Sequence, residues 1–132
     1  MNLNEILRPR RLDDYKPNQT PTEAYYYARK LKRRYPAGEH IIATDPWASY
    51  FYAFDVIKGP WKMGEAAIAS DPEHARFYAT EILKKPWPKG EQSIVTSPGI
   101  ASEYENFLDR VGTPEDGRRW NKLVDKARKL RK

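Results

Sequence analysis

The chain has 132 residues, no cysteine and a formal net charge of +6. This length suffices for one modest domain with a hydrophobic core, and the absence of cysteine excludes disulfides, thiol catalysis and cysteine-ligated zinc. No apolar run approaches the roughly 18 residues that a membrane span needs, and the first residues lack the apolar core of a signal peptide. We therefore expect one soluble, cytoplasmic domain (residues 1–132). Its basic charge indicates either an acidic partner, such as a nucleic acid or an acidic protein, or a solvated basic surface.

Residues 1–20 are expected to form an arm ahead of the first repeat. Leu3, Ile6 and Leu7 have the spacing of one amphipathic helical turn, and Pro9 ends it because proline disfavours a helical residue before it. We expect these apolar side chains, together with Leu12, to dock on the first repeat. The alternative is a flexible arm that grips a partner.

Four two-residue signals divide the rest of the chain into repeats. A side chain that can cap a helix precedes a proline at Thr20-Pro21, Asp45-Pro46, Asp71-Pro72 and Ser97-Pro98. The cap oxygen accepts a hydrogen bond from an unpaired amide of the first turn, and proline suits the first helical position because its missing amide has no partner there. The sequence thus predicts helices that begin at these prolines, in repeats 21–45, 46–71 and 72–97 and in a degenerate copy within 98–132.

Each repeat is predicted to be a hairpin of a long and a short helix. In the third copy, apolar residues have helical spacing over about 13 residues, whereas strict alternation would indicate a strand. An aromatic residue follows, and then a short helix with a glutamate in its first turn and an isoleucine that points back. In the three copies these residues are Tyr35, Glu39 and Ile42; Trp61, Glu65 and Ile68; and Trp87, Glu91 and Ile94. One hairpin cannot bury its apolar face alone, so we predict an all-α stack of hairpins.

A basic helix is predicted to close the stack. Thr113-Pro114 repeats the capping signal. Apolar residues then follow at helical spacing: Trp120, Leu123, Val124, Ala127 and Leu130. The remaining face is charged, as a terminal capping helix requires.

The repeats share a recognisable motif, which reads P-x-x-A-x-x-Y-A-x-x-V/I/L-I/L-K and then W-P-x-G-E-x-x-I. This motif resembles tandem helical repeats in small proteins of tailed bacteriophages, over residues 21–97 and more weakly over 98–111. Tyr35, Lys62 and Glu105 depart from it, at the tryptophan, proline and alanine positions respectively. The resemblance implies an all-α repeat fold and a phage origin, hence the cytoplasm of an infected bacterium. It carries no catalytic residues.

Basic side chains are the main candidates for binding a partner. They are Arg29, Lys30, Arg33, Arg34, Lys58, Lys62, Lys84, Lys85, Arg118, Arg119, Lys122, Lys126 and Lys129. Those of the final helix form either a solvated outer face or a phosphate-binding face, and phosphate contacts would make affinity fall steeply with salt.

The aromatic residues Tyr35, Trp61 and Trp87 have two interpretations. The first is an apolar plug inside each hairpin. The alternative is an exposed ladder on which nucleic-acid bases stack, with lysines interleaved. The repeated glutamates are expected to serve the fold of each unit, because an active site needs one asymmetric cluster; the alternative is a row that binds cations or a basic partner.

No catalytic set, metal site or cofactor motif stands out in the sequence. His40 and His74 are expected on the surface, since neither has a repeated acidic partner at metal-ligand spacing. We therefore expect a non-enzymatic protein without a cofactor, which binds a host or phage protein machine as an inhibitor or regulator. The alternatives are a basic accessory nucleic-acid-binding protein and a minor virion component.

Overall fold

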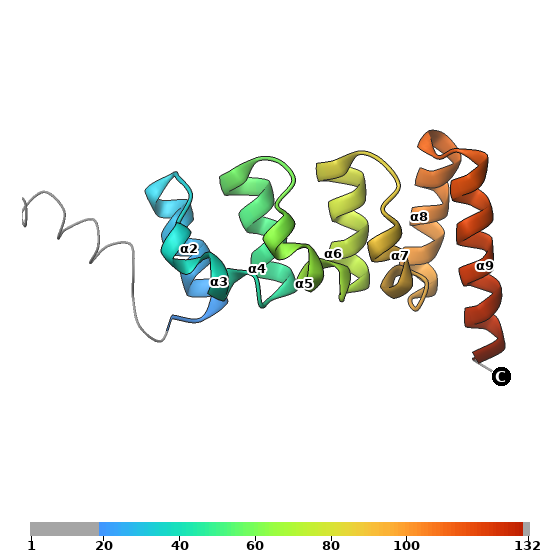
Figure 1. Ribbon diagram of the computed structural model, residues 1–132, viewed down its shortest axis with the longest axis horizontal. Coiled ribbons are helices and arrows are strands. Elements are labelled where there is room, and N and C mark those ends of the chain that lie inside the picture. Colours follow the sequence, from blue (N-terminus) through green and yellow to red (C-terminus); the bar gives the residue numbers. More distant parts are fainter. Residues whose placement is uncertain (1–18, 131–132) are drawn as a thin grey trace, which may run out of the picture.

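The computed structural model describes residues 19–130, which form an elongated row of helices packed side by side (Figure 1). The α-helices of this part are α2 (Pro21–Leu31), α3 (Glu39–Ile42), α4 (Pro46–Phe51), α5 (Glu65–Ala69), α6 (Pro72–Phe77), α7 (Pro88–Ile94), α8 (Pro98–Val111) and α9 (Pro114–Leu130). Residues 19–130 contain no strand, and the helices pack as adjacent pairs, with a longer and a shorter helix alternating from α2 to α7 once the π-helical continuations of α4 and α6 are counted, so the all-α prediction is confirmed. None of these helices has the length and apolar character that a membrane crossing requires. Most of the predicted arm lies outside the described residues, so its docking stays a prediction.

Side-chain caps start most of the long helices. Thr20 caps α2 as predicted and forms a capping box with Glu23, because its hydroxyl accepts from the Glu23 amide at 3.1 Å and the Glu23 carboxylate accepts from the Thr20 amide at 3.0 Å. Asp45 and Asp71 cap α4 and α6 by accepting from amides three residues later, at 2.7 and 3.0 Å. The hydroxyl of Ser97 makes no such bond, so the predicted cap of α8 is wrong, although α8 begins at the predicted proline.

An aromatic ring against a glycine closes each hairpin. The ring of Trp61 lies so near Gly64 that a β-carbon there would stand 2.5 Å from a ring atom. Tyr35 and Trp87 pack in the same way on the glycines of their own repeats. Any larger residue would push the ring out of the hairpin, which explains the aromatic-x-x-Gly spacing. The isoleucine of the second hairpin, Ile68, is fully buried as predicted.

Between the first proline and the aromatic residue, the second and third repeats have one residue more than the first repeat, and a π-helical turn accommodates it. Helix α4 continues as a π-helical segment, Tyr52–Ile57 (η2), and α6 as Tyr78–Leu83 (η4), whereas α2 is α-helical throughout. The Lys58 amide donates to the carbonyl of Ala53, five residues earlier, at 2.7 Å. This wider turn holds one more residue than an α-turn, so the aromatic residue after the helix takes the same place as in the shorter first repeat. The sequence predicted a continuous helix and not this turn. Short 3₁₀ turns, Pro36–Gly38 (η1) and Lys62–Gly64 (η3), lead into α3 and α5.

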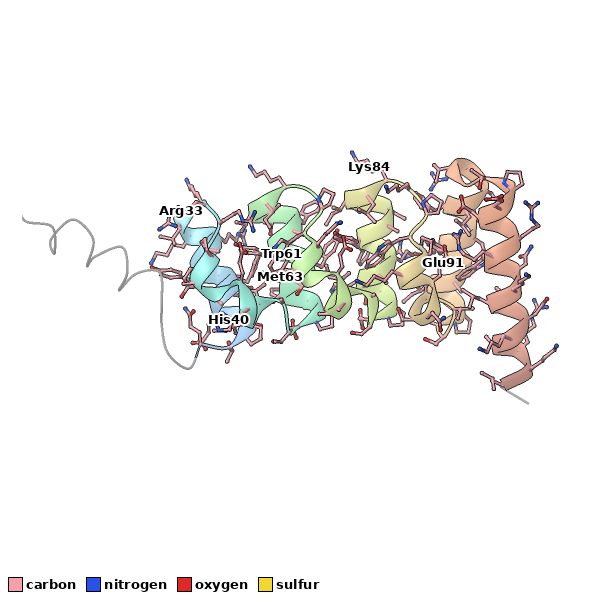
Figure 2. The ribbon with its side chains drawn as sticks, in the orientation of Figure 1. Arg33, His40, Trp61, Met63, Lys84 and Glu91 are labelled. Atoms are coloured by element: carbon pink, nitrogen blue, oxygen red, sulfur yellow. The ribbon has the colours of Figure 1, made fainter. Side chains whose placement is uncertain are left out.

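The long helices of the first three repeats end on lysines in the left-handed backbone region. The φ angle is 58° at Lys32, 62° at Lys58 and 57° at Lys84. A side chain with a β-carbon costs about 1–2 kcal/mol in this region, which glycine avoids. All three lysines are exposed, and Figure 2 shows Lys84 and Arg33 along the edge where the long helices end.

Helices α8 and α9 close the C-terminal end, as predicted. Trp120 of α9 is buried, and its ring centroid lies 5.0 Å from that of Tyr104. Trp87 and Tyr78 make the same contact at 4.7 Å, so Trp120 replaces the tryptophan of a fourth repeat. Leu130 was predicted on the apolar face but is 78% exposed, because α9 runs past the ends of its neighbours (Figure 1).

Candidate binding groove

A tyrosine joins each repeat to the one before it. At the last of these tyrosine joints, the Tyr104 hydroxyl accepts from the Trp87 amide at 3.0 Å and donates to Oε2 of Glu91 at 2.6 Å. The same two bonds recur at the earlier joints: Tyr78 with Trp61 and Glu65 at 3.0 and 2.7 Å, and Tyr52 with Tyr35 and Glu39 at 2.8 and 2.5 Å. Each tyrosine follows its glutamate by 13 residues and its aromatic partner by 17. The repeated glutamates therefore serve the fold, as expected.

Two of the three joint glutamates also bind an arginine. Arg34 donates to both carboxylate oxygens of Glu39, each at 2.9 Å. Arg119 of α9 donates to both oxygens of Glu91, at 2.8 and 2.7 Å. Glu65 makes no ion pair with a residue of the described chain. An arginine of the same chain thus neutralises the carboxylates of Glu39 and Glu91, whereas no described residue neutralises that of Glu65.

These contacts shift the pKa values of the groups at the joints. Burial raises the pKa of Glu39, but the hydrogen bonds from Arg34 and Tyr52 outweigh it, so this pKa lies below its ordinary value. Burial also raises the pKa of Tyr52, Tyr78 and Tyr104, and the bond that each donates to a carboxylate raises it further. The first joint therefore pairs a neutral tyrosine with an ionised glutamate at neutral pH.

The residues Tyr35, Trp61 and Trp87 lie inside the hairpins. They are only 0, 4 and 7% exposed, and the ring centroid of Trp61 lies 4.7 Å from that of Tyr52. The prediction of an apolar plug is therefore confirmed. The alternative of an exposed stacking ladder is wrong, because the rings pack against the glycines and tyrosines of their own repeats.

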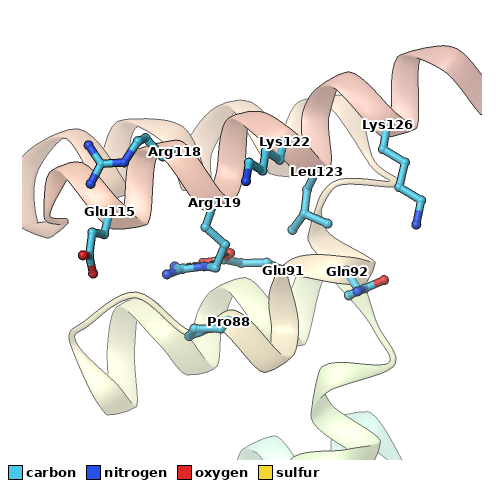
Figure 3. A pocket seen from close by; sticks show the side chains of 9 residues that line it. All are labelled: Pro88, Glu91, Gln92, Glu115, Arg118, Arg119, Lys122, Leu123 and Lys126. Atoms are coloured by element: carbon cyan, nitrogen blue, oxygen red, sulfur yellow. Dashed lines mark hydrogen bonds and ion pairs between the residues drawn. The ribbon is translucent and has the colours of Figure 1, made fainter.

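A groove of about 580 Å³ lies between α7 and α9 (Figure 3). Arg118, Lys122 and Lys126 line it from α9, and their spacing of four residues puts them on one face of the helix. All three are exposed, and none makes an ion pair with a described residue. The groove therefore presents a row of three uncompensated cations.

The rest of the groove is mixed in character. Pro88 of α7 and Leu123 of α9 add apolar surface, and two carboxylates also line the groove: Glu91, which is paired with Arg119, and Glu115, near the start of α9. Figure 3 shows Arg119 reaching from α9 toward Glu91 of α7. This ion pair ties the two walls together and fixes their separation.

The other basic residues predicted to bind a partner are spread along the stack. Lys58 and Lys84 line a smaller hollow of about 340 Å³. Arg34 and Arg119 donate to glutamates of the chain itself, so their main contacts are structural. The remaining candidates are exposed and do not line the groove: Arg29, Lys30, Arg33, Lys62, Lys85 and Lys129. The structure thus brings the predicted basic residues from Arg118 to Lys126 together in the groove and leaves the other candidates spread along the stack.

The two histidines differ in their surroundings. His40 is exposed, as predicted. His74 is half-buried: its Nδ1 lies 2.6 Å from Oδ2 of Asp71, and its ring packs near Tyr50. The prediction of a surface position is therefore wrong for His74, because its ring contacts the carboxylate of Asp71, the residue that caps α6.

Sequence reasoning missed the pair of Arg119 and Glu91, and with it the groove. The pair spans 28 residues and links a repeat to a helix outside the motif, so an alignment of repeats does not reveal it. One signal was present in the sequence. Arg119 directly precedes Trp120, just as Arg34 directly precedes Tyr35.

Comparison of the chain with protein-family models, with curated proteins and with solved structures found no match. The likeness to phage repeats therefore stays a prediction from the repeat motif.

Proposed function

We propose that this protein is a non-enzymatic binding protein that holds an acidic segment of a partner protein in the groove between α7 and α9. The row of Arg118, Lys122 and Lys126 carries this proposal. These side chains share one helix face, are exposed and have no acidic partner among the described residues. Neighbouring like charges repel one another, so an acidic partner that neutralises them gains both affinity and a faster association rate.

The apolar part of the groove favours a peptide over a nucleic acid. Leu123 and Pro88 offer surface that an aliphatic side chain can cover. Proteins that hold single-stranded nucleic acid combine cations with exposed aromatic rings on which bases stack. The residues that line this groove include no aromatic ring.

The ion pair beneath the groove preorganises the cations. Arg119 donates to Glu91 at 2.7 Å, which fixes α9 against α7, and it also donates to Asp116 of its own helix at 2.7 Å, which orients the guanidinium. A site whose walls are already held in place loses less conformational entropy when it binds. The repeat stack therefore acts as a rigid support for this face of α9.

The phage-like repeat motif suggests the source of the partner. We infer a bacterial host or phage protein that carries a run of acidic residues and is inhibited or regulated by the binding. The alternative is an accessory nucleic-acid-binding protein, which the net charge of +6 favours.

The test measures binding of a short, fluorescently labelled acidic peptide that contains one leucine. The variant R118A/K122A/K126A is expected to bind it about tenfold more weakly, because each exposed ion pair contributes about 0.5 kcal/mol. A matched control, K30A/R110A/K129A, also removes three positive charges, all outside the groove. Its affinity is expected to change little at physiological salt.

Two outcomes would count against the proposal. An equal loss of affinity in both variants would mean that only the net charge attracts the peptide. Tighter binding of a single-stranded DNA of the same charge would favour the alternative function. Affinity purification from infected bacteria then identifies the partner, as a protein that the control variant retains and the groove variant loses.

A further inference from the structure

We infer that Glu65 is a docking point for an arginine side chain of a partner protein. Its Oε2 accepts from the Tyr78 hydroxyl at 2.7 Å, and within residues 19–130 no hydrogen bond reaches its other carboxylate oxygen. Among the three glutamates at the tyrosine joints, it is the one without an arginine from the described chain. Among the described residues, the Glu65 carboxylate therefore keeps an oxygen available to a donor, whereas both carboxylate oxygens of Glu39 and of Glu91 accept from an arginine.

The chain itself shows what completes such a joint. Arg34 on Glu39 and Arg119 on Glu91 both bind through two nitrogens, at 2.7 to 2.9 Å. Arginine suits this contact because its planar guanidinium matches the two oxygens of a carboxylate, whereas lysine offers a single ammonium. We therefore expect the same geometry at the third joint.

Prolines occupy the positions that supply arginine at the other joints. At the first joint, Arg34 comes from the repeat that holds Glu39 and directly precedes the aromatic residue of that repeat. At the last joint, Arg119 comes from the side of the tyrosine and directly precedes Trp120, whose ring packs on Tyr104. At the middle joint, the equivalent positions are Pro60 and Pro86. Neither side of this joint can therefore supply the cation from these positions.

The carboxylate of Glu65 can be approached from solvent. Glu65 is half-buried, and Arg34, in the equivalent contact, keeps its side chain 55% exposed while it is bound. Met63, two residues before Glu65, is 56% exposed and offers apolar surface to the stem of an arginine. Figure 2 shows Met63 along the row of short helices that also carries Glu91.

Lys62 is the nearest basic residue in the sequence, three positions before Glu65. It is exposed and makes no ion pair with Glu65. A lysine that precedes a glutamate along a helix is in the weaker orientation for pairing, and its ammonium cannot bind both oxygens in one plane. Lys62 therefore leaves the two-point contact open.

This inference rests on the proposed protein-binding function and adds a contact of opposite charge. Helices α5 and α7 are neighbours, so one partner can place acidic residues in the groove and an arginine on Glu65. The two sites are tested with probes of opposite sign and with different variants. Either can fail while the other holds.

The methionines make the site easy to observe. The chain has two, Met1 and Met63, so labelling their methyl groups with carbon-13 gives two NMR signals, which a Met63→Leu variant assigns. Titration with the dipeptide acetyl-Leu-Arg-amide is expected to shift the Met63 signal in a saturable way. Acetyl-Leu-Lys-amide is expected to bind several-fold more weakly, and Glu65→Gln to weaken the arginine peptide about tenfold.

Two further variants make the experiment decisive. Glu73→Gln removes an exposed carboxylate elsewhere and is expected to leave the titration unchanged. Pro60→Arg is expected to move the Met63 signal in the free protein and to abolish the response to the peptide, because the chain then supplies its own arginine. An absent shift at Met63, an equal response to the lysine peptide, or an unchanged response in a folded Glu65→Gln variant would each overturn the inference. Tryptophan fluorescence reports whether each variant is folded.

Discussion

The hydroxyl of Tyr104 holds two repeats together, since it donates to Glu91 at 2.6 Å while it accepts from the backbone amide of Trp87 at 3.0 Å. Tyr104 and Glu91 are fully buried, and Trp87 is nearly so. Water therefore cannot replace either bond when the hydroxyl is removed. Tyr52 and Tyr78 make the same two contacts at the earlier joints, so a tyrosine hydroxyl is the polar link that recurs between repeats.

Removal of the Tyr104 hydroxyl is expected to destabilise the protein by about 1–3 kcal/mol, because Tyr104→Phe leaves a buried amide and a buried carboxylate each short of a partner. Urea unfolding followed by tryptophan fluorescence measures this loss. Tyr26→Phe is the control, since Tyr26 is 50% exposed and its change should stay within about 0.5 kcal/mol. Equal effects of the two substitutions would mean that the joint contributes little.

Gly64→Ala is expected to lower the stability by about 1–3 kcal/mol, because the new β-carbon would stand 2.5 Å from the Trp61 ring and force it to move. Gly117 provides a contrast in α9, where a β-carbon would meet no neighbouring side chain within 4 Å. Gly117→Ala should stabilise the protein by up to about 1 kcal/mol through helix propensity. Thermal unfolding of both variants gives opposite signs if the ring requires the glycine.

Lys58→Gly is expected to stabilise the protein by up to about 1 kcal/mol, since glycine adopts the left-handed conformation of this residue without a steric cost. Lys58→Ala removes the same charge but keeps the β-carbon, so it should bring no gain. A comparison of urea midpoints separates the two effects. Stabilisation by alanine as well would assign the effect to the charge instead of to the backbone.

Stability is expected to fall above about pH 10, where tyrosines of the unfolded chain lose their protons. Burial and the adjacent carboxylates raise the pKa of Tyr52, Tyr78 and Tyr104 in the folded state, and burial raises that of Tyr50 to about 12. The folded state thus binds more protons, so the contribution of each tyrosine is complete below its unfolded pKa and is lost as the pH rises through its folded pKa. The loss approaches about 1.4 kcal/mol per pH unit for each such tyrosine.

Urea unfolding at a series of alkaline pH values measures this slope. The variant Tyr78→Phe should show a shallower fall, by about one proton, because it has one tyrosine fewer to hold protonated. A slope that does not change in Tyr78→Phe would contradict the assignment to the joints.

The parts of the fold that follow from local chemistry could be predicted from the sequence. Thr20, Asp45 and Asp71 cap helices through amides only three residues away, so their role is visible in the residue order. The repeat spacing in turn predicted that Trp61 and Trp87 fill equivalent places inside the hairpins, where both are buried.

The features that the sequence did not reveal depend on contacts across the stack. The additional residue before Lys58 could have entered a loop, and only the packed neighbours select a π-helical turn. The two-point contact of Arg119 with Glu91 joins segments 28 residues apart and lies outside the repeated motif. Arg119 therefore stood among the partner-binding candidates together with Arg118 and Lys122, and the structure shows that its guanidinium binds Glu91 within the groove that all three line.

The constant offset between each tyrosine and its glutamate has a consequence for how such a chain can change in length. Pro46 and Pro72 are 26 residues apart, and the contacts at both ends of this segment are of one kind. Excision of residues 46–71 would bring Tyr78 opposite Glu39, and duplication would insert another copy of the same interface. The array is modular in this sense, and its span can grow or shrink by whole units while α9 and the surface beside it keep their form.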